Sequence, residues 1–136
     1  MSAFGPFEIA GSALAAQSLR LNLTASNLAN AESVAGDPRE VYRARHAIFR
    51  AVGTSFADAL AGVRVLGVLE STAPPVERYD PGHPQANADG IVYAASINPI
   101  EEMANMISAS RSYQHNLEVI NTTKQLLLRT LSLGQA

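Results

Sequence analysis

Apolar residues near the start of the chain recur at helical spacing and predict a long helix over residues 7–30. Pro6 stands just ahead of this stretch, where proline suits a helix start, and no proline interrupts it. Two apolar stripes run along the predicted helix, so we expect it to have neighbours on more than one side. One stripe contains Ala10, Leu14, Leu21, Ala25 and Leu28, and the other contains Ile9, Ala13, Ala16 and Leu23.

A second long helix is predicted from residue 99 to Gly134, which suits a C-cap. Asn98 suits the N-cap and Pro99 the first helical position. Glu101 and Glu102 follow in the first turn, where the helix dipole favours negative charge. Side chains at alternating spacings of three and four predict a heptad seam of Met103, Met106, Ser110, Tyr113, Leu117, Ile120, Lys124, Leu127 and Leu131. Such a helix is roughly 50 Å long, whereas a compact chain of this length has a radius of gyration of about 14 Å.

The stretch between the helices has β-branched and aromatic residues bounded by Gly and Ser, which predicts a small β-rich insert. We expect strands at 41–49 and 63–69, arranged as a hairpin, and a short third strand at 91–93. Pro74-Pro75 is expected to break the chain, and residues 79–84, with the sequence Tyr-Asp-Pro-Gly-His-Pro, to form an ordered polar turn.

These elements predict a mainly α fold. The N-terminal axial helix (1–30) and the C-terminal axial helix (99–136) form one unit, an antiparallel coiled-coil hairpin, and the β-rich insert (31–98) is carried at one end. The outward surfaces of the pair carry alanines and leucines in place of dense charge, which marks them as surfaces for self-assembly or co-assembly. We therefore expect burial to be completed by other molecules.

Composition narrows the classes of function. The 136 residues are 47% hydrophobic and 16% charged, with a net charge of −2, which is too apolar for a disordered tail and gives no basic field for nucleic acid. The absence of cysteine excludes disulfides, iron–sulfur clusters and thiolate zinc sites. We expect no membrane span, because no stretch approaches the roughly twenty apolar residues it needs. We also expect no cleaved signal peptide, because a basic start and an apolar core are lacking.

Candidate catalytic and metal-binding groups are few. His46, His83 and His115 fall in a predicted strand, loop and helix, with no spacing typical of metal ligands. No nucleophile elbow or phosphate-binding glycine loop occurs. The sequence therefore predicts no enzyme, no metal and no cofactor. A catalytic carboxylate in the loop of Asp80, His83 and Asp89 is the alternative, although turn chemistry explains these residues.

One short stretch is basic. Four arginines with Glu40 among them give residues 39–50 a net charge of +3, whereas residues 51–118 carry eight acidic and three basic residues, or −5. This contrast favours charge complementarity between copies or partners, which sets register and specificity. A solvated strand face explains the arginines equally well. Nucleic acid ranks below both, because no aromatic stacking pattern accompanies the arginines.

Asparagine is a poor helix former, yet six asparagines lie on the predicted helices. Buried between helices, each needs a hydrogen-bond partner and specifies alignment at a cost in stability. Exposed, each is only tolerated. The apolar surroundings favour the buried interpretation for Asn22, Asn27, Asn30, Asn105, Asn116 and Asn121.

The stretch Ser26-Asn27-Leu28-Ala29-Asn30-Ala31 resembles the signature of flagellar rod and hook proteins, whose N-terminal helix ends in Asn-Leu-Ala-Asn-Ala. Similar stretches cover nearly the whole chain, at 9–14, 42–44, 79–84, 102–103, 110–113 and 131–134. The length matches a short rod member of this family, because distal-rod and hook relatives carry larger inserts. Two linker stretches depart from the family pattern, Gly90-Ile91-Val92 and Ala95-Ser96-Ile97.

The resemblance implies a structural subunit of the proximal rod of the bacterial flagellar basal body. In that family the terminal helices pack as a coiled coil, and subunits stack helically around an export channel and transmit torque from the motor ring to the hook. The implied partners are further copies, other rod proteins, the membrane ring with its rod adaptor, and the flagellar type III export apparatus. The implied location is the rod in the periplasmic space, reached without a cleaved signal peptide. The rival is a soluble coiled-coil adaptor or export chaperone that does not polymerise.

We predict that subunit contacts use two sets of residues, neither of which binds a metal or cofactor. The helices contribute Leu14, Leu21, Asn27, Leu28, Asn30, Met106, Tyr113, Asn116, Leu117, Ile120, Asn121 and Leu127. The insert contributes Arg39, Arg43, Arg45 and Arg50.

Overall fold

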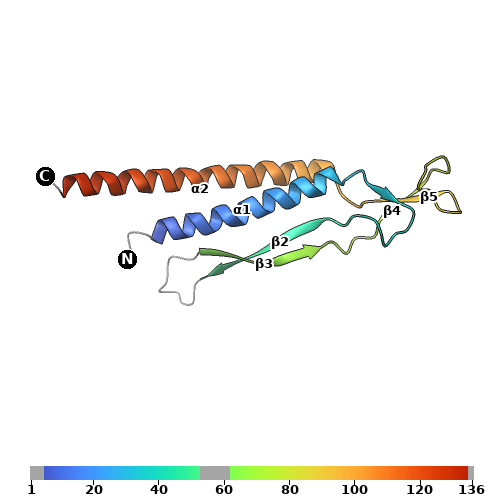
Figure 1. Ribbon diagram of the computed structural model, residues 1–136, viewed down its shortest axis with the longest axis horizontal. Coiled ribbons are helices and arrows are strands. Elements are labelled where there is room, and N and C mark those ends of the chain that lie inside the picture. The colour runs from blue at the N-terminus through green and yellow to red at the C-terminus, as the bar shows by residue number, and fades with distance from the viewer. Residues whose placement is uncertain (1–4, 53–61, 135–136) are drawn as a thin grey trace.

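The computed structural model describes residues 5–52 and 62–134. Two helices, α1 (Gly5–Ala29) and α2 (Pro99–Leu133), pack against each other, and the described strands lie between them in the sequence. Figure 1 shows an elongated molecule whose helices run in opposite directions, so that α1 begins and α2 ends at the same end. The predicted helix pair with a small antiparallel β insert is confirmed. Neither of these helices is long and apolar enough to cross a membrane.

α1 is the central element of the molecule. α2 packs along one side of it, and a hairpin of β2 (Arg45–Val52) and β3 (Gly62–Glu70) packs along another (Figure 1). At its fully buried apolar positions α1 has only Ala10 and Ala16, whose small side chains let both neighbours approach. The prediction that this helix has neighbours on more than one side is confirmed.

The hairpin is antiparallel, with Arg45 paired to Glu70 at one end and Val52 to Gly62 at the other. A bulge lies between Ile48 and Phe49. The expectation that the whole insert is carried at one end of the helix pair is wrong, because this hairpin lies along α1. The physical reason is its half-buried face: Ala47 and Phe49 border the same groove as Leu23 and Thr24 of α1.

The predicted strand over 41–49 begins only at Arg45. Val41 and Ala44 are buried just before β2, and the backbone amide of Arg45 donates to Asn27 Oδ1 on α1. The Ala44 carbonyl still accepts from the Ser71 amide at 2.7 Å, and the contact of Arg45 with Asn27 fixes the start of the strand at this point.

A second sheet lies at one end of the helix pair, opposite to the end where the chain begins and ends (Figure 1). Its order is β1 (Val34–Ala35), β5 (Ile91–Ala94) and β4 (Val76–Tyr79), and both pairings are antiparallel. The sequence does not predict β1, which is two residues long, or β4, which follows the expected break at Pro74-Pro75. β4 is an edge strand, and a proline just before such a strand removes no ladder hydrogen bond.

The loop between β4 and β5 is the ordered turn that the sequence predicts. The Asp80 amide donates to the Gly90 carbonyl at 2.9 Å, and the His83 amide donates to the Asp80 carbonyl at 3.1 Å. Asn87 Oδ1 accepts from the Ile91 amide at 2.9 Å. Gly90 has φ of +74°, a conformation that favours glycine.

The ends of α2 follow the sequence signals. Asn98 Oδ1 accepts from the Ile100 amide at 3.1 Å, Pro99 opens the helix, and the Gly134 amide donates to the Thr130 carbonyl at 3.1 Å. Both predicted ends are confirmed.

The side of α2 that packs against α1 has the predicted heptad spacing. At every second position of this seam, however, the packed residue is the one before the predicted residue. The less exposed residues of the seam are Glu102, Met106, Ala109, Tyr113, Asn116, Ile120, Thr123 and Leu127, and Ser110 of the predicted seam is half-buried beside Ala109. Met103, Leu117, Lys124 and Leu131 of the predicted seam are exposed, and that part of the prediction is wrong. At these positions the seam contains a polar or small side chain one residue earlier. A pattern of large apolar residues does not predict such positions.

Burial within the described chain is shallow. The buried apolar residues there are six alanines and two valines, Val41 and Val92. The largest fully buried side chains are Val92 and Asn27. Because the larger apolar side chains keep contact with water, one copy does not close a core around them.

Candidate assembly interface

A buried polar contact joins α1, α2 and the start of the hairpin. Asn27 is fully buried on α1, and its Nδ2 donates to Glu102 Oε2 of α2 at 2.9 Å and to the Arg45 carbonyl at 3.0 Å. Its Oδ1 accepts from the Arg45 amide at 2.9 Å and from the Tyr42 hydroxyl at 3.1 Å. One side chain thus fixes three segments relative to one another.

The contact continues along the helix interface. Glu102 is only 5% exposed, and its Oε1 accepts from Asn105 Nδ2 at 3.4 Å. Asn105 Oδ1 in turn accepts from an Arg20 guanidinium nitrogen at 3.3 Å. We name this chain of Arg20, Asn105, Glu102, Asn27 and Tyr42 the polar bridge. Since burying a carboxylate is costly without partners, the bridge favours one alignment of the helices over others.

Sequence reasoning found only part of this bridge. It singled out Asn27 and Asn105 as helix asparagines, but it gave Glu102 no role beyond the helix dipole and Tyr42 none at all. A glutamate in the first turn gives no signal that distinguishes a buried from an exposed side chain.

The other predicted asparagines lie differently within the single chain. Asn30 Nδ2 donates to the Ser26 carbonyl and Asn116 Nδ2 to the Ser112 carbonyl, both at 2.8 Å and within their own segments. Asn22 and Asn121 are exposed. Within the single chain, Asn27 is therefore the asparagine that is buried between the helices as expected. Asn105 lies in the same interface and is half-buried.

The predicted apolar contact residues divide into two groups. Those with half-buried side chains between α1 and its neighbours or along the α2 seam are Leu14, Leu21, Leu28, Met106, Tyr113, Ile120 and Leu127. Leu117 is exposed at 43% and lies on a different side of α2.

Leu117 belongs to an apolar flank of α2 that no described element covers. At about 100° per residue, the exposed side chains of Met103, Ile107, Leu117 and Leu128 fall within roughly 80° of one another around the helix. We name these four residues the outer flank. It adjoins the seam, which explains why the apolar pattern and the packing differ by one position.

α2 also extends past the beginning of α1 (Figure 1). It has 35 residues against 25 in α1. Residues 126–133 of α2 contain five leucines, and Leu126, Leu128, Leu131 and Leu133 are all exposed. At about 100° per residue, these leucines spread over roughly 220° around the helix, and Ser132 and Arg129 occupy the remaining side. Such a broad apolar surface is typical of a helix with neighbours on more than one side.

The four predicted arginines lie in different surroundings. Arg39 pairs with Asp37 at 2.7 Å, and this contact lowers the pKa of the Asp37 carboxyl to about 2. Arg45 pairs across the hairpin with Glu70 at 3.0 Å, and its guanidinium lies 5.7 Å from the centre of the Tyr42 ring. Arg50 is exposed on β2 directly opposite Arg64 of β3, which sequence reasoning did not single out.

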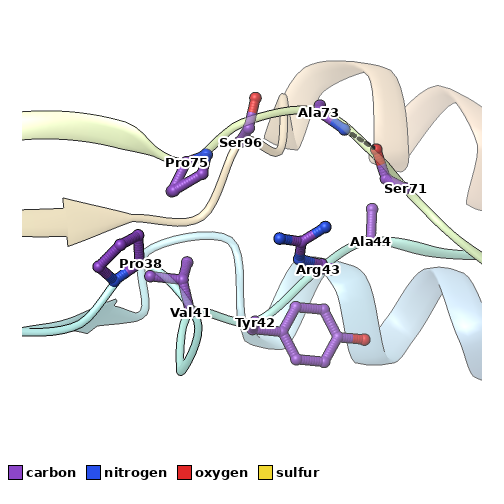
Figure 2. Close-up of a pocket in the computed structure, with 9 residues that line it drawn as sticks. All are labelled: Pro38, Val41, Tyr42, Arg43, Ala44, Ser71, Ala73, Pro75 and Ser96. Atoms are coloured by element: carbon purple, nitrogen blue, oxygen red, sulfur yellow. Dashed lines mark hydrogen bonds between the residues drawn. The ribbon is translucent and has the colours of Figure 1, made fainter.

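Arg43 lines a small crevice between residues 38–44 and the segment before β4 (Figure 2). Pro38 and Pro75 stand on either side of it, and Ser96 lies at its edge. Its volume of about 10 Å³ is close to that of a single water site. This crevice is too small for a substrate.

The histidines and acidic groups take structural positions. His83 Nδ1 accepts from the Gln85 amide at 3.1 Å, and Asp80 lies 3.7 Å from Arg78. His46 borders the groove between α1 and β2, and His115 is exposed on α2. Within residues 5–52 and 62–134, no three His, Asp or Glu side chains are grouped as metal ligands.

Comparison with known proteins identifies similar sequences along the chain. A family model described as "Flagella basal body rod protein" matches residues 7–36, and one described as "Flagellar basal body rod FlgEFG protein C-terminal" matches residues 88–133. The flagellar basal-body rod protein FlgC of Salmonella typhimurium is 51% identical over 135 residues, covering 99% of this chain and 100% of the relative. FlgC of Escherichia coli O157:H7 is 50% identical with the same coverage. FlgC of Bacillus subtilis is 33% identical over 151 residues, again covering 99% and 100%.

Proposed function

Since the chain belongs to the flagellar basal-body rod protein family, as a structural rod subunit and not an enzyme, we propose that it forms part of the proximal rod. In this proposal subunits stack helically around the export channel and transmit torque from the motor ring to the hook. α1 and α2 pack there as a coiled coil, and residues 1–30 and 99–136 act as one unit that carries the insert 31–98.

The observation that carries this proposal is the leucine-rich end of α2. Leu126, Leu128, Leu131 and Leu133 are exposed on several sides of the helix, at the end of α2 that extends past the beginning of α1 (Figure 1). Burying a leucine side chain contributes about 1.5–3 kcal/mol relative to leaving it in water. Neighbouring subunits that surround this segment gain that free energy, which a partner binding on one side recovers only in part.

The outer flank supplies the lateral contacts of the assembled rod. Leu117 and its flank neighbours meet the helices of adjacent copies, and the half-buried seam residues hold each copy to itself. Arg39, Arg43, Arg45 and Arg50 of the insert contact neighbouring subunits, where charge sets register. Asn30, Asn116 and Asn121 align neighbouring subunits in this proposal, as Asn27 aligns three segments inside the chain.

The partners in this proposal are further copies, other rod proteins, the membrane ring and its rod adaptor. The subunit reaches the periplasmic rod through the flagellar type III export apparatus, without a cleaved signal peptide. A shallow core of alanines suits such a route, because a chain with little internal burial unfolds at low cost before export and completes its burial on assembly.

The test is to replace Leu117 with Asp in flagellated cells that make no other copy of the chain. Leu117 is exposed, so Leu117→Asp is expected to leave the protein level unchanged and to stop basal-body formation and swimming. Ile120→Asp, at a half-buried position, is expected to lose assembly as well. Thr122→Asp adds the same charge at an exposed polar position and serves as the control.

Normal swimming and intact basal bodies in the Leu117→Asp strain would contradict the proposal. Electron microscopy of the purified chain with co-expressed rod proteins distinguishes the rival adaptor function. A rod subunit forms tubular or ring-shaped particles, whereas an adaptor forms a small complex with one partner.

A further inference from the structure

The outer face of the β2–β3 hairpin combines apolar and basic side chains. Ala47 and Phe49 lie toward α1, so the alternation of the strand turns Ile48 and Arg50 away from it. Arg64, the partner of Arg50, lies on the same outer face, and Leu66, the unpaired residue of β3 at the bulge beside Ile48, is exposed too. We name Ile48, Arg50, Arg64 and Leu66 the hairpin face.

The two arginines of the hairpin face repel each other. Like charges directly opposite on an antiparallel pair destabilise it. A carboxylate placed between Arg50 and Arg64 would relieve this repulsion. The hairpin face is therefore suited to a surface that is both apolar and acidic.

The opposite end of the molecule presents such a surface. β4 is an edge strand whose residues are all exposed, and Glu77 and Tyr79 lie on one of its faces, paired with Tyr93 and Ile91 of β5. Arg78 points to the other face, near Asp80 at 3.7 Å. The Tyr79 side chain is 75% exposed. We name Glu77 and Tyr79 the β4 face.

The charges along the long axis also differ, with an acidic region around β4 and a basic hairpin. Residues 32–43, before β2, and residues 76–90, around β4, carry six acidic side chains and three arginines, a net charge of −3. The hairpin strands carry three arginines and Glu70, a net charge of +2. Figure 1 places β4 beyond one end of the hairpin, and the register places Arg50 and Arg64 near its other end.

Building on the proposed function, we infer that the hairpin face of one copy binds the β4 face of a second copy displaced along the long axis. Glu77 lies between Arg50 and Arg64, and the Tyr79 ring packs on a guanidinium and the apolar side chains. Two hairpin faces cannot pair with each other, because four arginines would meet. The contact therefore joins different surfaces and leaves one of each free, which is the kind of interface that continues into a helical assembly.

Cysteine trapping tests this contact, and the chain has no cysteine of its own. The variants Leu66→Cys and Tyr79→Cys are mixed, allowed to assemble together and then oxidised. We expect this mixture to give a disulfide-linked dimer that neither variant gives alone. Tyr79→Cys mixed with Ser108→Cys, an exposed position on α2, is the control. Equal dimer yields in all mixtures would overturn the inference.

Charge exchange gives a second, independent test. Arg50→Glu with Arg64→Glu is expected to weaken self-association about tenfold at low salt, and so is Glu77→Lys. All three substitutions in one chain restore complementary faces and are expected to recover most of the loss. Arg111→Glu on α2 is the control for charge alone. Unchanged association in the single-face variants, in protein that still forms rods, would overturn this inference and leave the proposed function standing. Absence of any rods in the unaltered protein would instead overturn the proposed function.

Discussion

Asn27 Nδ2 lies 2.9 Å from Glu102 Oε2, and both side chains are buried between the two helices. The amide of Asn27 also donates to the Arg45 carbonyl, and its oxygen accepts from the Arg45 amide and the Tyr42 hydroxyl. This single side chain therefore satisfies a buried carboxylate and both backbone groups at the start of the hairpin. Such a contact adds specificity to a helix interface whose buried apolar residues are alanines.

Asn27→Ala is expected to lower the free energy of unfolding by about 2–4 kcal/mol, because it removes the hydrogen bond to the buried Glu102 Oε2 and leaves the Arg45 amide and carbonyl without the Asn27 partner. Asn22→Ala is the matched control, since Asn22 is an exposed asparagine on the same helix. There we expect a change within about 0.5 kcal/mol. Urea titration followed by circular dichroism, at one fixed high protein concentration, measures both. Equal effects of the two substitutions would show that the bridge is dispensable.

Ala109 is fully buried in the seam of α2 toward α1. Ala109→Leu inserts a larger side chain between helices in contact and is expected to destabilise the protein by about 1–3 kcal/mol. Ser108→Leu, one residue earlier and exposed, is expected to change stability little. The same urea titration distinguishes them. Tolerance of leucine at position 109 would contradict the displaced seam.

The displaced seam shows where sequence reasoning stops. The ends of α2 could be predicted because Asn98, Pro99 and Gly134 act locally, through caps and a fixed proline dihedral. The side of α2 that faces α1 could not be predicted. Ala109 lies there because the helices approach closely, and Glu102 lies there because Asn27 of α1 donates a hydrogen bond to it. The apolar residues that the pattern selected, such as Leu117, lie outside and serve contacts that one chain does not contain.

The insert gives the same lesson for strands. β3 contains three valines and β2 contains Ile48, Phe49 and Val52, so local composition was enough to predict that both strands exist, although not where β2 begins. β4 is defined by its pairing with β5, fifteen residues further along the chain, and no local pattern reports that pairing. The position of the hairpin along α1 likewise depends on contacts such as Phe49 with the helix, which only the three-dimensional structure reveals.

Gly90 is required by the turn before β5. A Cβ there would lie 3.0 Å from Pro81 Cβ and 3.1 Å from Tyr79 Cε2, and φ is +74°. Gly90→Ala is therefore expected to destabilise the loop by about 1–3 kcal/mol and to speed hydrogen exchange at the Asp80 amide, which donates to the Gly90 carbonyl. Gly82→Ala is the control, because its Cβ meets nothing closer than 3.9 Å. Slow exchange in both variants would show that the turn does not need glycine.

The pKa of Asp37 is lowered from 3.8 to about 2, first by the Arg39 side-chain hydrogen bond and then by the hydrogen bond from the Arg39 backbone. A carboxyl whose pKa is lowered in the folded state stabilises the protein at pH values above its ordinary pKa of 3.8. This contribution is lost as the pH falls toward 2. Arg39→Ala is expected to raise the pKa of Asp37 back toward 3.8 and to leave the urea midpoint at pH 7 nearly unchanged, because the pair lies at the surface. Nuclear magnetic resonance titration of the Asp37 carboxyl measures the shift. An unaltered titration in the variant would show that Arg39 is not its cause.

A double-mutant cycle on Asn27 and Glu102 separates stability from alignment. Glu102→Leu alone leaves the Asn27 amide with one fewer acceptor, and Asn27→Leu alone leaves a buried carboxylate, so each is expected to destabilise the protein. In the double variant the lost contacts are shared, and we expect a coupling free energy of about 1–3 kcal/mol. Because two leucines at this position no longer prefer one helix alignment, cysteine crosslinks between α1 and α2 are expected to form at more than one register in the double variant. A single register there would assign the alignment to the alanine packing of Ala16 and Ala109 in place of the polar bridge.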